Sequence, residues 1–265
     1  MRLNIKSFFI PLGLLPLHLS AQGPVTGFFP EGDETVLALT LADERFDRYN
    51  FGDEPREAVQ RSGSVSFFME HGLRDHTSLI VTAPYIWVDA DDRGFQDVSV
   101  WLKYRNGYRE SGAAKWTTAT AVGLSFPIAD YPTMSSNPIG QKATYFQGRL
   151  VVQYQAPFGV FFHLQSGIDF QIIPTVRQAI PVLFRAGAGS RIVVAEAWLE
   201  YYNTLSNGID QTLAAGEGSD WLRTGGTLYF TITPAFGLYA NGAFMLGGQN
   251  VGLSRRFGVG FVLRI

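Results

Sequence analysis

Cysteine is absent from this sequence of 265 residues, and only 17% of the residues are charged. Without cysteine the chain forms no disulfide and cannot be anchored as a lipoprotein. Beyond residue 21 no run of about 18 apolar residues occurs, which excludes a membrane-spanning helix. Even so, 46% of the residues are hydrophobic and the mean hydropathy is +0.05. Apolar and polar residues are therefore interleaved, which favours strands with two different faces.

The N-terminal residues have the order of a secretory signal peptide. Residues 1–21 begin with two basic side chains, Arg2 and Lys6, continue with a short apolar run, and end in small residues. We predict cleavage after Ala21, which would change the formal net charge from −2 to about −4. This mildly acidic balance argues against nucleic acid as a partner. Residues 22–33 are rich in proline and glycine, and we predict an irregular periplasmic lead-in there.

Residues 98–105 show the alternation of the rest of the chain most clearly. One face carries Val98, Val100, Leu102 and Tyr104, and the other carries Ser99, Trp101, Lys103 and Arg105. An apolar face opposite a polar face is typical of a transmembrane barrel strand, whose outside meets lipid and whose inside meets water. We therefore predict an all-β fold, an antiparallel transmembrane β-barrel over residues 34–265. About twelve strands are expected, with 10 or 14 as alternatives, at 34–42, 62–71, 78–88, 98–105, 116–126, 148–156, 160–172, 181–189, 192–202, 220–232, 235–245 and 253–265.

Long and short connections alternate along this series of strands. The long ones are expected outside the cell if the chain starts in the periplasm. Residues 43–60 read as a polar loop in water, and residues 127–147 as a loop that folds over or into the pore. In the strand at 116–126 the inward residues are small, among them Ala121 and Gly123, and would leave room in the lumen.

The inward faces carry charged and polar side chains that we take as candidates for the lumen wall. They either pair across a narrow lumen, because buried charges need compensation, or line a polar path that selects solutes. We favour a narrow channel, constricted by side chains and by the loop at 127–147. The candidates are Lys103, Arg105, Arg149, Gln153, His163, Gln165, Asp169, Glu196, Glu200, Arg256 and Arg264.

Three segments carry a family resemblance: GLRDHTSLIVTAPYIWV, GFQDVSVWLKYR and AVGLSFPIADYP. With them the chain resembles the outer-membrane barrels described as the MetA-pathway of phenol degradation family, although it departs from the family's usual Gly-Leu-Gly-Asp entry by having Gln96 before Asp97. The resemblance implies transport of small, often hydrophobic or aromatic molecules, and it brings no catalytic residue. The last strand resembles the signal read by the barrel-assembly machinery, with Ile265 in place of the usual closing aromatic residue.

Two other functions were weighed against a channel. A His-x-Ser spacing at His76 and Ser78 occurs in outer-membrane lipid hydrolases, but here it falls in a turn on the periplasmic side. A closed structural or adhesive barrel is the other alternative. We predict a passive channel of the bacterial outer membrane and no enzyme. Neither a metal nor another cofactor is expected, since His163 lacks further ligands and the acidic run at residues 89–92 lacks the spacing of a calcium loop. The expected partners are membrane lipid, the assembly machinery and a small solute.

Overall fold

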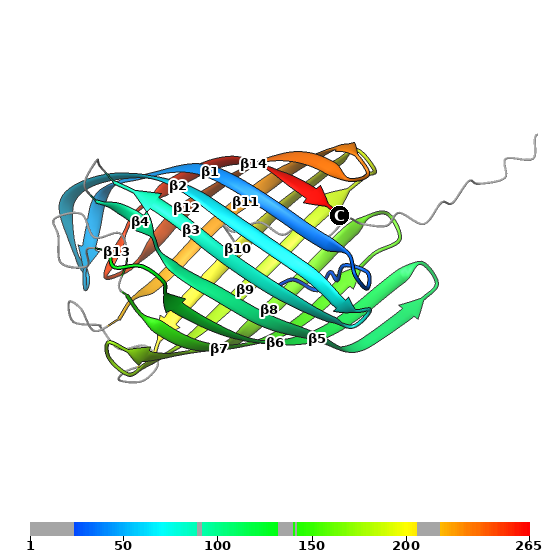
Figure 1. The fold of residues 1–265 in the computed structure, drawn as a ribbon. Coiled ribbons are helices and arrows are strands. Elements are labelled where there is room, and N and C mark those ends of the chain that lie inside the picture. Colours follow the sequence, from blue (N-terminus) through cyan, green and yellow to red (C-terminus); the bar gives the residue numbers. More distant parts are fainter. Residues whose placement is uncertain (1–23, 89–91, 132–139, 141, 206–217) are drawn as a thin grey trace, which may run out of the picture.

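A computed structural model describes residues 24–88, 92–131, 140, 142–205 and 218–265. These residues form twelve long strands and two short ones, β4 and β13, which extend the wall at one end (Figure 1). Among the described residues no helix has the length and apolar character needed to span a membrane. The strands are β1 (Thr35–Phe51), β2 (Glu54–Arg74), β3 (Thr77–Trp87), β4 (Arg93–Phe95), β5 (Asp97–Ser111), β6 (Ala114–Pro127), β7 (Thr144–Gln155), β8 (Val160–Ile173), β9 (Arg177–Gly189), β10 (Val193–Thr204), β11 (Asp220–Thr233), β12 (Phe236–Gln249), β13 (Val251–Gly252) and β14 (Arg255–Arg264).

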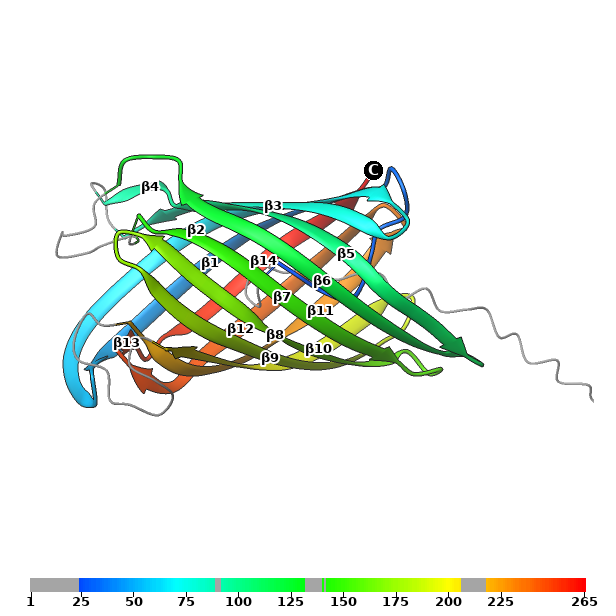
Figure 2. The ribbon, with the colours of Figure 1, turned by 90° about the horizontal axis from the view of Figure 1, so that it is seen from below.

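The sheet closes on itself as an antiparallel barrel, as predicted. Neighbouring strands pair in chain order, and β1 pairs with both β2 and β14. Leu39 of β1 stands opposite Phe67 on one side and Phe261 on the other, which fixes the register of the closure. Because a closed barrel has no free strand edge, every long strand finds its backbone partners within the wall. Figure 2 shows the tilted strands from below.

The two faces of the wall differ as the alternation predicts. Leu150, Leu164 and Val259 point outward and are 65%, 52% and 57% exposed. Val151 and Gln165, each next to one of these residues along its strand, point inward and are buried. An outer surface of this kind is suited to lipid.

The prediction of a polar loop at residues 43–60 is wrong. β1 and β2 instead continue as a paired hairpin through this stretch and turn only at Gly52 and Asp53 (Figure 1). Gly52 has a φ of 57°, a conformation that glycine adopts without strain. The charged side chains that suggested a loop form cross-strand pairs, such as Asp43 with Arg61 at 2.8 Å. They mark a strand pair in water, beyond the apolar part of the wall.

The small inward residues of β6 do not leave open space, so that prediction was also wrong. The Trp101 ring of β5 covers Gly123, where an added Cβ would lie 2.3 Å from the indole. In the same way Trp198 covers Gly225 and Tyr239 covers Gly260. Each glycine admits an aromatic ring from the neighbouring strand, and the rings fill the interior. Side-chain size on one strand is therefore a poor guide to the width of the lumen.

Candidate functional site

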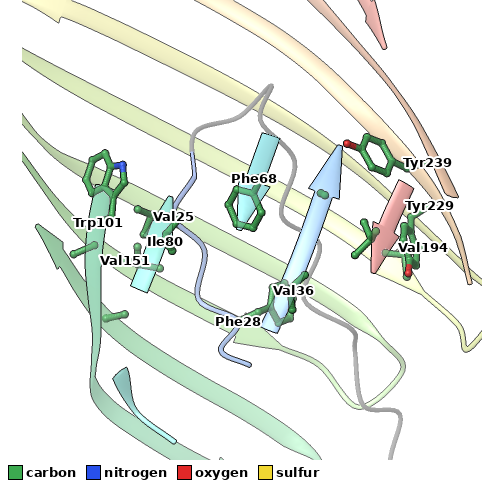
Figure 3. Close-up of a cluster of buried hydrophobic side chains, with 14 of the residues drawn as sticks. Val25, Phe28, Val36, Phe68, Ile80, Trp101, Val151, Val194, Tyr229 and Tyr239 are labelled. Carbon is green, nitrogen blue, oxygen red and sulfur yellow. The ribbon is translucent and has the colours of Figure 1, made fainter. Parts of the chain in front are cut away.

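The first described residues lie inside the barrel. We name Pro24–Pro30 the inner segment. Val25 and Phe28, with 0% and 6% exposure, are buried among inward-facing side chains of the wall, and Figure 3 shows the coil that carries them between the strands. The lead-in that we predicted at residues 22–33 thus enters the lumen for much of its length. Its signal in the sequence is the uncharged, apolar stretch from Pro24 to Pro30, which is unsuited to a segment in water.

Hydrogen bonds and ring contacts hold the inner segment in place. Lys103 Nζ donates to the carbonyl oxygen of Phe28 at 2.5 Å. The Phe28 ring meets Phe161 of β8 edge-on, with 5.4 Å between the ring centroids. The Phe29 ring is covered by two cations, since Lys103 Nζ lies 4.0 Å and Arg105 Cζ 4.5 Å from its centroid. The long side chain of Lys103, with its apolar stem and charged end, thus anchors the inner segment, which forms no strand.

Glycine allows the inner segment and the residues after it to approach the wall closely. A Cβ added to Gly27 would lie 2.6 Å from the Cβ of Gln153, which is too close for any side chain. Where the chain leaves the lumen, Asp33 N donates to Gly72 O at 2.7 Å and Gly72 N donates to Glu34 O at 2.9 Å. The segment is fitted against β7 and tied to β2.

Lys103 has a carboxylate beside it inside the barrel. Its Nζ lies 2.6 Å from Oε1 of Glu70, and both side chains are fully buried. Ser78 Oγ donates to the same oxygen at 2.5 Å. The pair links β5 to β2 across β3, and the ammonium keeps a further proton for Phe28 O.

An apolar layer crosses the lumen around the inner segment (Figure 3). Trp101 lies on one side of the coil, and Tyr229 and Tyr239 lie on the other. Eleven of the twelve long strands contribute to this one cluster, and β9 alone among them does not. Its members are Val25, Phe28, Val36, Ala38, Phe68, Ile80, Trp101, Ala119, Ala121, Val151, Phe161, Val194, Tyr229, Tyr239 and Val262.

The remaining candidate lumen residues stand on inward positions and most of the charged ones are paired. The Arg149–Asp169 and Arg223–Glu200 pairs are 2.6 Å apart, and Arg185 lies 3.8 Å from Glu196. Arg256 lies 3.9 Å from Glu44, and Arg264 lies 3.1 Å from Glu34. Among the candidates, Arg105 is held mainly by its contact with Phe29. These pairs join neighbouring strands of the wall, and Arg264 pairs with the residue just before β1, so they are not the pairing across a narrow lumen that the sequence offered as an alternative.

Gln153, His163 and Gln165 form a buried polar group beside the inner segment. His163 Nδ1 lies 3.3 Å from Gln153 Oε1. Within the described part of the chain, His163 Nε2, Gln153 Nε2 and Gln165 Oε1 have no protein hydrogen-bond partner. Buried polar atoms of this kind usually bind water. The described residues contain no group of three or more His, Asp or Glu side chains that could hold a metal ion.

Two cavities of about 220 Å³ each lie in the lumen. One, which we name the mouth cavity, lies toward the barrel end opposite the C-terminus, and its wall includes Tyr145, Arg177, Tyr202 and Trp221. The other is bounded by Pro24 of the inner segment together with residues of β2 and β3. These aromatic and basic residues are not among the lumen candidates predicted from the sequence, although their alternation in β7, β9, β10 and β11 places them inward.

The loop predicted to fold over the pore is described only in part, since residues 132–139 and 141 lie outside the described residues. Tyr131 is buried, and its hydroxyl donates to Oδ1 of Asp97, an inward position at the start of β5, at 2.5 Å. Lys142 N donates to the same hydroxyl oxygen at 2.8 Å. The described part of this loop thus turns inward over the wall.

The His-x-Ser spacing does not form a hydrolase site on the outer surface. Ser78 points into the barrel, is fully buried and donates to Glu70. His76 lies in the β2–β3 turn, and its ring packs edge-on against Tyr104, with 5.4 Å between the centroids. A serine in this position has no access to lipid.

No family model and no curated protein matches the sequence, so the resemblance to the MetA-pathway of phenol degradation family stays a prediction. Solved structures do match. The COG4313 outer membrane channel from Pseudomonas putida F1 has a TM-score of 0.70 and 13% identity, over 90% of this chain and 97% of that one. The NanC porin has a TM-score of 0.55 and 10% identity, over 84% and 98%. The KdgM porin has 0.54 and 9%, over 85% and 98%. The chain shares the fold of these barrels.

Proposed function

We propose that the chain is a passive channel of the bacterial outer membrane for small solutes, hydrophobic or aromatic ones included. The inner segment closes the channel, and its displacement opens it. The observation that carries this proposal is the apolar layer, in which Val25 and Phe28 of the inner segment are packed in one cluster with side chains from eleven strands of the wall. Removing the segment would take away a carbonyl partner of Lys103 and two ring contacts while leaving the wall strands paired.

The other contents of the lumen suit a passage more than a solid core. The two cavities lie within the barrel, and the buried polar group at His163 lies beside the inner segment. The fold is also that of solved outer-membrane channels and porins. One of them, the KdgM porin, was solved in complex with disordered oligogalacturonate. Polar ring solutes therefore belong among the candidates.

Conductance of the refolded protein in planar bilayers tests the proposal. The parent chain begins at Gln22, the predicted mature end, and is compared with a variant lacking residues 22–30 and with Gly27→Leu. Leucine at position 27 has no room beside Gln153, so the segment must leave its seat. We expect both variants to conduct at least several-fold more than the parent chain.

Gly247→Leu is the matched control, because a Cβ at Gly247 would meet nothing within 4 Å. It should conduct like the parent chain. A mobility shift on boiling before gel electrophoresis shows that each variant has folded. If the folded deletion variant conducts no more than the parent chain, the channel proposal fails and a closed structural or adhesive barrel is favoured.

A further inference from the structure

We propose that the mouth cavity is a binding site for a small carboxylate carried on a flat ring. This inference rests on the proposed function, since a solute entering from the end opposite the C-terminus would meet this cavity before the inner segment. The cavity is built from the inner faces of β7 to β11, together with Tyr49 of β1 and Asn250. Rigid strands hold most of its lining, as specific binding requires.

A stack of flat groups forms one wall of the cavity. The rings of Tyr202 and Trp221 are parallel, with an interplanar angle of 4° and 5.2 Å between their centroids. Arg223 lies 5.0 Å from the Trp221 ring and 5.4 Å from the Trp198 ring, and its pairing with Glu200 fixes it there. Arg223 thereby holds the stacked rings of Tyr202 and Trp221 in place. Rigid aromatic surfaces bind flat apolar faces at a small cost in conformational entropy.

Several polar groups of the cavity can donate hydrogen bonds. Arg177 contributes a guanidinium, which can donate two parallel hydrogen bonds to one carboxylate. Within the described part of the chain, the hydroxyls of Tyr49 and Tyr202 and the indole N–H of Trp221 donate to no protein acceptor. Together these groups favour a ligand that accepts hydrogen bonds.

The acidic residue in the lining does not oppose an anion strongly. Oδ1 of Asp169 lies 2.6 Å from Arg149 NH1 and accepts a hydrogen bond from Gln147 at 3.0 Å. Its charge is therefore compensated by a neighbouring strand. Gln171 accepts from Tyr145 at 3.1 Å, so the amide is also occupied within the wall.

The cavity has room for a ligand with one ring. A protein cavity of about 150 Å³ holds benzene. At about 220 Å³ the mouth cavity has room for one six-membered ring with a carboxylate. An aromatic acid and a sugar acid share this chemistry, and the choice between them is left to the binding experiment.

Isothermal titration of the refolded protein in detergent tests the site without any need for conduction. The probes are benzoate and galacturonate, their neutral counterparts benzyl alcohol and galactose, and acetate as a carboxylate without a ring. We expect at least one ring carboxylate to bind at least ten-fold more tightly than its neutral counterpart and than acetate. Tighter binding of benzoate assigns an aromatic acid, and tighter binding of galacturonate assigns a sugar acid.

Arg177→Gln and Trp221→Leu should each raise the Kd of the bound acid ten-fold or more. Arg191→Gln, at an exposed position in the β9–β10 turn, is the matched control and should leave it unchanged. Equal binding of acid and neutral probe, or an unchanged Kd in Arg177→Gln, overturns the inference. Because the titration needs no open channel, it can succeed when conduction fails, and conduction can succeed when it fails.

Discussion

Lys103 links the stability of the wall to the position of the inner segment. Its ammonium lies between Glu70 and the carbonyl of Phe28 and is excluded from solvent. Taking two charges out of water costs several kcal/mol for each ion, and their attraction offsets this cost only while both are present. The pair therefore stabilises the barrel little in net terms, but loss of one partner leaves an uncompensated charge. The distinctive contribution of Lys103 is its hydrogen bond to the carbonyl oxygen of Phe28, which fixes the inner segment.

Single and double substitutions of this pair should differ. Lys103→Met leaves Glu70 buried without its cation and should destabilise the barrel by about 3–5 kcal/mol. Lys103→Met combined with Glu70→Met removes both charges and should be markedly more stable than the single variant. Urea unfolding in lipid vesicles measures both free energies. A double variant as unstable as the single one would contradict this account of the pair.

Which side chains face inward could be predicted from the sequence, but their partners could not. The period of two along each strand places Lys103 and Arg149 in the lumen. Lys103 pairs with Glu70 two strands away, and this contact depends on strand tilt and register, which no local pattern specifies. The inner segment was missed for a related reason, because its partners Gln153 and Phe161 are more than 120 residues away in the sequence.

At the scale of single strands, the prediction failed where charge was taken as the mark of a loop. β1 and β2 pair for many residues beyond the apolar part of the wall, and their outward charges lie in water. The alternation rule therefore continues past the membrane, with polar residues replacing apolar ones on the outer face. The outer face of β1 and β2 thus has two zones, one with apolar outward residues and one with charged outward residues that lie in water.

The two zones predict opposite responses to the same substitution. Leu164 points outward midway along β8, and arginine there would lie in lipid, at a cost of about 2–4 kcal/mol. Val59 points outward in the β1–β2 hairpin and is 73% exposed, so arginine there should change stability by less than about 1 kcal/mol. Unfolding free energies in vesicles of the two variants compare the zones directly. Equal effects would mean that the zone boundary is misplaced.

At the scale of the whole molecule, the barrel and the inner segment form one closed unit. The wall supplies side chains from eleven of its strands to the apolar layer, while the segment supplies Val25 and Phe28. Burying such a side chain is worth about 1.5–3 kcal/mol. Two of them, with the contact to Lys103, give a seat that favours the closed state but that a modest change can reverse. If the inner segment gates the channel as proposed, single substitutions at its seat should shift the balance between closed and open.

The absence of cysteine from the natural chain makes a reversible lock possible. Gly27→Cys with Gln153→Cys introduces the only two thiols, and the Cβ positions are 2.6 Å apart, so a shift of about 1 Å gives disulfide geometry. When the pair is oxidised, the segment is bound to the wall and conductance should fall to the closed level. When it is reduced, the cysteine at position 27 has no room beside position 153, and conductance should exceed that of the parent chain. Gly27→Cys alone should stay open under both conditions. If oxidation of the pair left conductance high, solute would pass beside a seated segment, and the gate would lie elsewhere in the lumen.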